Sequence, residues 1–161
     1  MITKNQIQFI KSLKFKKNRI KHQLFVVEGK KNINELLNSD YEVISIYATK
    51  FWISNNPKLN AKKISSNELK SISNQKNPNE VLAIVKMKSC KNFSNFGVVL
   101  VLDNINDPGN MGTILRICDW FDIHHIVCSN NTVDIYNPKV VQSSMGSIFR
   151  VNVRYTNLID Y

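Results

Sequence analysis

Apolar and polar residues alternate along the first half of the chain in short blocks that predict strands and helices in turn. Thr3 and Gln6 stand three positions apart ahead of an apolar stripe, which is typical of a capped helix start. Ser65 and Glu68 repeat this signature further along. Strands are predicted over residues 24–27, 42–48 and 81–87, and helices over residues 3–13, 33–37 and 65–72. This alternation favours a compact α/β module.

The pattern changes in the second half of the chain. Residues 97–102 form a nearly continuous apolar run, which is typical of a strand buried on both faces of a parallel sheet. A polar loop is predicted next, followed by a helix, a strand, a helix and a strand over residues 112–121, 126–128, 138–145 and 148–153. This order predicts the beginning of a doubly wound parallel sheet. We expect one domain over residues 1–88, a linker without periodicity over residues 89–96, and a second domain over residues 97–161.

Charge separates the two halves more sharply than hydropathy does. The 161 residues carry a net charge of +10, but residues 1–91 hold 18 basic and 6 acidic side chains, whereas residues 92–161 hold 4 and 6. A basic half joined to a near-neutral half indicates a module that binds a polyanion. A codon bias toward lysine is an alternative explanation, although it does not explain why Lys139 is the only lysine after Lys91.

Composition excludes several classes of protein. Hydrophobic residues make up 43% of the chain, which is enough for a buried core. The longest apolar run covers residues 98–102 and is too short to span a bilayer. The first residues lack the apolar stretch of a secretion signal, so we expect a cytoplasmic protein. Three scattered cysteines without a CxxC pair predict neither a disulfide framework nor a metal site.

The segment from Leu102 to Arg116 is the most informative part of the chain. It joins the end of a predicted strand to a helix, where open α/β sheets bind ligands. Asn110 offers both a donor and an acceptor, and the guanidinium of Arg116 can reach a phosphate or polarise a hydroxyl. The alternative is an ordinary turn and helix cap, with Arg116 in a surface salt bridge. The segment has neither the P-loop nor the dinucleotide-binding glycine pattern.

The same segment carries a family resemblance. It resembles the first motif of the SpoU/TrmH-type RNA 2′-O-ribose methyltransferases of the SPOUT superfamily. The segment reads Asp103-x-x-x-Asp-Pro-Gly-Asn-x-Gly-Thr-Ile-x-Arg116 and is followed by an aromatic-containing helix. Residues 137–149 are similar to that family's next helix and small-residue turn. The first half of the chain resembles the substrate-binding domain that precedes this motif in the family. The resemblance is carried by Arg19, residues 25–29 and Asn77-Pro78. The resemblance therefore covers nearly the whole chain.

The resemblance implies a specific reaction. Members of the family transfer a methyl group from S-adenosylmethionine to a ribose 2′-hydroxyl of rRNA or tRNA, usually as homodimers. By motif position, Asn110 and Arg116 are the expected catalytic residues. We expect the basic half to bind RNA through a set of mostly charged side chains: Lys16, Lys17, Arg19, Lys21, Glu28 and Lys30.

The departures from the family pattern also matter. Ile117-Cys118 replaces the usual Thr-Ala, and Asp122 stands where glycine is usual. The family's second and third motifs, which tie its trefoil knot and contact the cofactor, have no counterpart, so no residue is assigned to S-adenosylmethionine. The expected architecture is thus a small α/β RNA-binding module followed by the N-terminal part of a SPOUT domain, an incomplete α/β knot.

Two other interpretations remain open at this point. The chain could be a non-catalytic RNA-binding remnant of such an enzyme. Alternatively, residues 109–112 could form the backbone-clamping GXXG loop of a KH-like module, although that loop joins two helices and here follows a strand-like run. His124 and His125 stand at the entry to a predicted strand, which favours a structural role for both.

Overall fold

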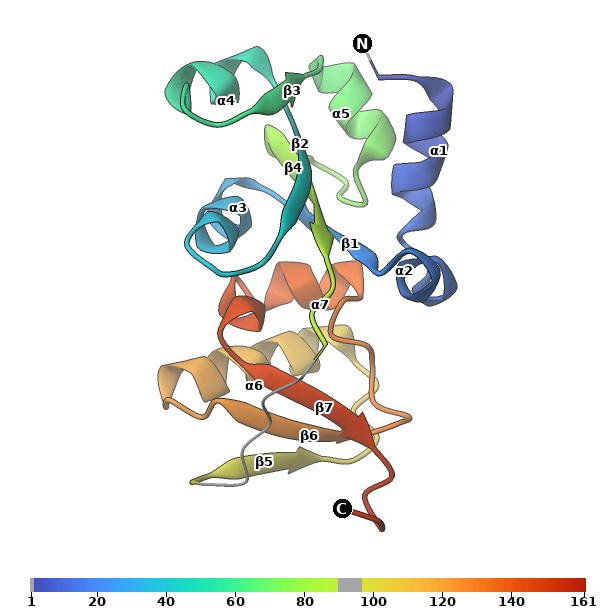
Figure 1. The fold of residues 1–161 in the computed structure, drawn as a ribbon, viewed down its shortest axis with the longest axis vertical. Coiled ribbons are helices and arrows are strands. Elements are labelled where there is room, and N and C mark those ends of the chain that lie inside the picture. Colours follow the sequence, from blue (N-terminus) through green and yellow to red (C-terminus); the bar gives the residue numbers. More distant parts are fainter. Residues whose placement is uncertain (1, 90–96) are drawn as a thin grey trace. The chain divides into compact units, whose positions relative to one another are not determined.

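The computed structural model describes residues 2–89 and 97–161. The chain divides into two compact units, Met1–Met87 and Lys88–Tyr161, which Figure 1 shows as ribbons. Most of the predicted linker, residues 90–96, lies outside the described residues. No helix in the described ranges is long and apolar enough to cross a bilayer.

The first unit is built on a four-stranded mixed sheet. Its strands are ordered β1-β4-β2-β3, and β3 is parallel to β2 while the other neighbours are antiparallel. In chain order the strands are β1 (Leu24–Glu28), β2 (Val43–Ala48), β3 (Ala61–Lys63) and β4 (Val81–Lys86). The helices are α1 (Lys4–Ser12), α2 (Lys16–His22), α3 (Lys30–Leu37), α4 (Lys50–Asn55) and α5 (Ser66–Ile72). All the elements expected from the apolar pattern are present, and α2, α4 and β3 were not expected.

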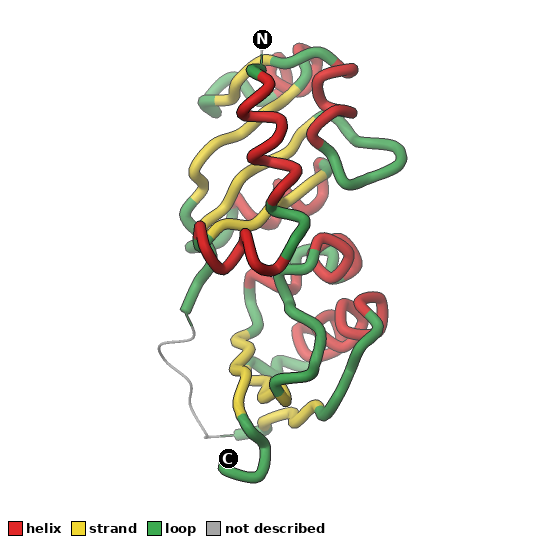
Figure 2. Tube along the Cα trace, turned by 90° about the vertical axis from the view of Figure 1, so that its right-hand side faces the viewer, coloured by secondary structure: helices red, strands yellow, loops and turns green. Residues whose placement is uncertain are grey.

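Helices cover both faces of this sheet. Apolar residues of α1 and α5 form one buried cluster with alternate residues of the strands, among them Ile10, Ile72, Val26 and Ile84. Helix α3 contacts β1 and β4 and buries Ile33 and Leu36, while the intervening strand residues, such as Phe25, form the opposite buried face. Figure 2 shows the resulting helix–sheet–helix layering of this unit.

Both predicted capping boxes are present and one of them ties two helices together. The Oγ1 atom of Thr3 accepts from the Gln6 N–H at 3.2 Å, and Ser65 Oγ accepts from the Glu68 N–H at 3.2 Å. The Glu68 carboxylate also accepts the backbone N–H groups of Ser65 at 2.7 Å and Ile2 at 3.0 Å. These two bonds lower the pKa of Glu68 to about 2.

The second unit contains a three-stranded parallel sheet. Its strands are β5 (Val99–Leu102), β6 (His125–Ser129) and β7 (Asn152–Thr156), with β6 in the centre. The crossover helices are α6 (Pro108–Trp120) and α7 (Pro138–Ser143), and a short 3₁₀ turn, η1 (Ser147–Phe149), leads into β7. Both crossover helices lie on the same face of the sheet (Figures 1 and 2).

Two cysteines lie in the core between this sheet and its helices. Cys118 on α6 and Cys128 on β6 are fully buried and reduced. Burial raises the pKa of both thiols, and that of Cys128 reaches about 12. Both side chains are therefore neutral, apolar parts of the core at physiological pH.

The structure corrects four expectations for this unit. Strand β5 is not buried on both faces, because both helices cover one face and leave Val101 50% exposed; for the same reason the described sheet is wound on one face only. Helix α6 begins at Pro108 rather than at residue 112. The last strand begins at Asn152, not residue 148, because Gly146 adopts a positive φ of 97° and the apolar residues after it form the 3₁₀ turn η1.

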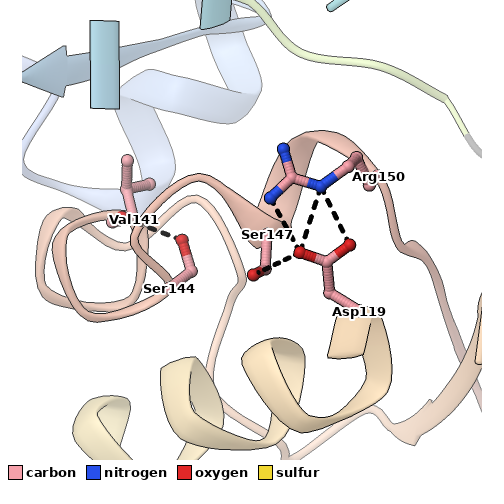
Figure 3. A network of polar contacts seen from close by, with 5 residues as sticks. All are labelled: Asp119, Val141, Ser144, Ser147 and Arg150. Atoms are coloured by element: carbon pink, nitrogen blue, oxygen red, sulfur yellow. Dashed lines mark hydrogen bonds and ion pairs between the residues drawn. The ribbon is translucent and has the colours of Figure 1, made fainter. Parts of the chain in front are cut away.

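A partly exposed ion pair joins the end of α6 to the residue that follows η1, as Figure 3 shows. The Arg150 guanidinium donates from Nε to both Asp119 oxygens, at 2.8 and 3.0 Å, and from Nη2 at 2.7 Å. Ser147 Oγ donates to the same carboxylate at 2.8 Å. The Arg150 bonds, and then the Ser147 bond, hold the pKa of Asp119 below its usual 3.8.

We expect Asp119→Asn to lower the free energy of unfolding by about 1–2 kcal/mol at neutral pH, because the Arg150 guanidinium loses its charged acceptor. The folded-state pKa is depressed, so the wild-type contribution is complete above pH 3.8 and is lost as the pH falls through the lower folded value. Urea unfolding at pH 7 and at pH 3 would measure both effects.

The matched control is Asp122→Asn, since the Asp122 side chain is 89% exposed and pairs with the exposed His124. This variant should change stability by no more than ~0.5 kcal/mol. Equal losses in the two variants would show that the Asp119 network does not stabilise the unit.

Candidate functional site

Helix α6 begins at the carboxyl end of β5, the edge of a parallel sheet where ligands bind. Asp107 caps the helix, because its Oδ1 atom accepts the Asn110 N–H at 2.7 Å. Pro108 occupies the first helical position, where its missing N–H and fixed φ suit the helix. Asn110 is therefore held in the first turn of α6. The KH-like interpretation is wrong, because residues 109–112 lie inside a helix that follows a strand.

Gly112 brings α6 into backbone contact with α7. A Cβ atom at this position would lie 2.0 Å from Ser143 Oγ and 2.8 Å from the Ser143 carbonyl carbon, so no larger residue fits without moving α7. The Ser143 hydroxyl oxygen in turn lies 3.0 Å from the Pro108 carbonyl oxygen and 2.7 Å from that of Lys139, both within hydrogen-bonding distance. The first turn of α6 is thus positioned by the end of α7.

Asn110 and Arg116, the expected catalytic residues, both have exposed side chains. Neither side chain forms a hydrogen bond or ion pair with any other described residue, so the surface salt bridge of the alternative interpretation is absent there. Six helical positions separate them, which places them ~120° apart around the axis and ~9 Å apart along it. Thr113 lies between them on the helix surface and donates to the Gly109 carbonyl at 3.0 Å. The structure therefore places both residues along one exposed stripe without direct contact.

Two hydroxyls, one at the last residue of β6 and one in the loop that follows, order the same edge of the sheet. Ser129 Oγ accepts the Asn104 N–H at 2.9 Å, and Thr132 Oγ1 accepts the Ile105 N–H at 3.3 Å. The hydroxyls also lie 3.1 Å from each other. They tie the loop after β5 to the loop after β6. The sequence interpretation missed them, although hydroxyl residues at or just after the end of a strand are a usable signal for such loop contacts.

The six residues expected to bind RNA separate into two groups. Lys16, Lys17 and Lys21 are exposed on α2. Lys30 is partly exposed, and its ammonium lies 2.7 Å from a Glu80 oxygen. The remaining two, Arg19 and Glu28, are buried.

Arg19 is only 2% exposed and its guanidinium donates to backbone carbonyls, to Leu13 at 3.0 Å and to Lys14 at 2.6 Å. It closes the corner between α1 and α2. Glu28 is 7% exposed; it accepts a short hydrogen bond from Ser73 Oγ and the Asn74 N–H at 2.9 Å. Both residues hold loops in place, so their expected role as direct RNA contacts is corrected to a structural one.

The described residues contain no group of three or more histidine, cysteine, aspartate or glutamate side chains that could hold a metal ion. His124 is exposed and lies 3.0 Å from Asp122 through its Nε2 atom. Among the expected site residues, Arg116 can offer a cation and Asn110 an amide to a ligand, and the exposed lysines of α2 can offer ammonium groups.

Two family models match the chain. Residues 97–161 match the SpoU rRNA Methylase family, and residues 4–83 match the MRM3-like substrate binding domain. Among curated proteins, the chain is 28% identical to the 23S rRNA (guanosine(2553)-2′-O)-methyltransferase RlmP of Bacillus subtilis over 98% of its length. It is 27% identical to rRNA methyltransferase 3, mitochondrial, of Xenopus tropicalis over 87% of its length.

Solved structures agree with these matches. A TrmH-family protein from Porphyromonas gingivalis superimposes with a TM-score of 0.90 at 34% identity over 99% of the chain. The SpoU methyltransferase AviRb from Streptomyces viridochromogenes, solved with AdoMet, has the same fold at a TM-score of 0.81 and 22% identity over 96% of the chain.

The length of these proteins differs from that of the chain. The chain spans 65% of the Bacillus relative, 37% of the Xenopus relative, and 65% and 64% of the two solved chains. Both of its units nevertheless match, in the order that the family motifs predict. The second unit, residues 97–161, belongs to the SpoU methylase family, and the first unit matches an MRM3-like substrate binding domain over residues 4–83.

Proposed function

We propose that the protein methylates a ribose 2′-hydroxyl of rRNA with S-adenosylmethionine as the methyl donor. The observation that carries this proposal is the exposed Arg116 on α6, without a partner among the described residues and in the family's first motif at the carboxyl edge of a parallel sheet. The names of the Bacillus and Xenopus relatives support rRNA as the substrate.

A ribose hydroxyl is a weak nucleophile, and the residues of α6 can strengthen it. When the 2′-hydroxyl gives its proton to solvent water, negative charge develops on the oxygen. This oxygen then bonds to the methyl carbon while the carbon–sulfur bond breaks, and S-adenosylhomocysteine leaves. The Arg116 guanidinium can stabilise that charge while it holds an adjacent RNA phosphate through a second N–H group. The Asn110 amide, one end of the same stripe, can orient the ribose by donating and accepting hydrogen bonds.

The methyl donor supplies an electrophilic methyl group on sulfur. In an open α/β sheet it would bind at the carboxyl edge of β5 and β6. The Ser129 and Thr132 hydroxyls at this edge are already bonded to each other and to loop N–H groups. We therefore assign them to holding the loops and assign no donor contact to any described residue.

The first unit supplies the RNA affinity in this proposal. Lys16, Lys17 and Lys21 lie exposed within one short helix, whose corner is held by the buried Arg19. A helix anchored from inside presents its ammonium groups at fixed positions, which suits contacts with a phosphate backbone. Cytoplasmic rRNA is the expected target.

Arg116→Lys should lower the rate of methyl transfer by ~10²-fold or more, because lysine keeps the charge but lacks the planar fork that holds a phosphate and a hydroxyl together. Thermal stability should hardly change, since the side chain is exposed. Transfer of labelled methyl groups from S-adenosylmethionine to rRNA would measure the rate.

Arg154→Lys on β7 is the matched control and should methylate at the wild-type rate. If Arg116→Lys also does so, the catalytic assignment of Arg116 is wrong. RNA binding without any methyl transfer by the wild-type protein would instead favour a non-catalytic RNA-binding protein.

Replacing Lys16, Lys17 and Lys21 together with alanine should weaken rRNA binding by about tenfold or more at moderate salt. The slope of log affinity against log salt should also become shallower by ~2–3, because about three phosphate contacts are lost. Filter binding over a range of salt concentrations would measure both quantities.

A second triple variant, in which Lys58, Lys70 and Lys76 are alanine, makes the same change in net charge elsewhere on the first unit; all three lysines are exposed. It should retain most of the affinity. Equal losses in the two variants would show that the charge of the unit acts diffusely and that α2 is not a specific RNA surface.

We also propose that the protein is a homodimer that associates through the end of α6. Ile117, Trp120 and Phe121 are 49%, 85% and 68% exposed, which is unusual for adjacent large apolar side chains. Light scattering should give twice the 18.6 kDa chain mass, and Trp120→Ser should shift the protein toward the monomer. A monomeric wild-type protein at micromolar concentration would contradict this proposal.

A further inference from the structure

The first unit contains a hollow that the proposed methyl transfer does not use. It has a volume of about 1000 Å³ and lies among the end of β2, the start of α4, β3 and the start of α5. Figure 1 shows these elements gathered at the end of the unit that also holds the N-terminus. The residues of its lining that matter here are Thr49, Lys50, Phe51, Lys63 and Glu80.

Phe51 presents an aromatic ring to this hollow. It is 64% exposed, whereas the next residue on the same short helix, Trp52, is only 3% exposed and anchors α4 in the unit. The Lys30 ammonium lies 5.4 Å from the centre of the Phe51 ring and 2.7 Å from a Glu80 oxygen. Lys30 is not part of the hollow's lining, so this contact supports the ring while leaving it accessible from the hollow.

The polar lining is incompletely satisfied. Thr49 Oγ1 and Glu80 Oε2 are buried and have no hydrogen-bond partner among the described residues. Buried polar atoms are normally paired, so two such atoms in the lining of one hollow indicate a place where a ligand or water completes the hydrogen bonding. Lys50 and Lys63 are exposed and place two ammonium groups in the same lining, which also holds the carboxylates of Glu68 and Glu80.

We propose that this hollow binds one unpaired nucleotide of the substrate RNA. Its base stacks on Phe51, and its phosphates lie against Lys50 and Lys63. The Glu80 carboxylate and the Thr49 hydroxyl, after a small movement of the lining, accept N–H or O–H groups of the base and ribose. An aromatic platform flanked by lysines is the combination that recognises single-stranded nucleic acid.

This assignment rests on RNA being the substrate of the protein, and it adds a specific preference. A base paired in a helix cannot reach an aromatic ring inside a hollow, so the first unit would favour RNA with an unpaired nucleotide at this point. Lysines on the edge strand β3 could also serve only to prevent pairing with other chains. Phe51 distinguishes the two roles, because an aromatic ring contributes nothing to edge protection.

Binding of a fluorescently labelled single-stranded oligoadenylate by the full chain tests the proposal. Phe51→Ala should weaken this binding by about tenfold, the usual scale for losing one stacked base, while Phe51→Trp should preserve it. Ile44→Ala is the control: Ile44 is a 49% exposed residue of β2 outside the hollow, and its variant should bind as the wild type does. Circular dichroism melts should be unchanged for the Phe51 variants, because the side chain is exposed.

Fluorescence of the tryptophan introduced at position 51 reports directly on stacking of a base against this side chain. Oligoadenylate should quench the emission of Phe51→Trp in a saturable way, and a polyaspartate peptide should not. Wild-type affinity in Phe51→Ala, or quenching by polyaspartate equal to that by oligoadenylate, would overturn the nucleotide site while leaving RNA binding by α2 intact. Failure of the wild-type protein to bind any RNA would overturn the proposed function itself.

Discussion

The backbone contact between α6 and α7 at Gly112 is the constraint on which the geometry of the second unit depends. Ser143 fills the space that a side chain at Gly112 would need, and its hydroxyl oxygen lies within hydrogen-bonding distance of the Pro108 carbonyl. The buried side of α6 is therefore fixed at its first turn, and the directions of Asn110 and Arg116 follow from helix geometry alone. Side chains proposed for catalysis that make no hydrogen bonds to other described residues can be positioned in this way.

The first unit contains charged side chains of two kinds, some buried and hydrogen-bonded and others exposed to solvent. Arg19 and Glu28 are charged residues that the sequence places among the surface lysines, yet each is buried and satisfied by neighbouring polar groups. Burial of such groups is tolerated only when they are hydrogen-bonded, and here the bonds shape the loops that carry the exposed residues. The lysines of α2 remain in solvent as a result, where they are available to a polyanion.

Periodicity and motifs were sufficient to predict most strands, both capping boxes and the family. They failed where elements are short: α2 and α4 have seven and six residues and too few apolar positions to show a helical period. The start of α6 was readable from Asp107-Pro108, a cap followed by a first-turn proline. The burial of Arg19 was not readable, because its acceptors are backbone carbonyls that any sequence supplies. Motif position identified Asn110 and Arg116 but could not show how far apart the helix places them.

The buried thiols of the second unit have a practical consequence. Cys118 and Cys128 are the core cysteines, and residues 1–87 contain none. Protonated, enclosed thiols react with alkylating reagents only when the structure around them opens. Once Cys90 is replaced, the rate of alkylation measures how often the second unit alone opens. Opening of the second unit can thus be followed separately in the intact chain.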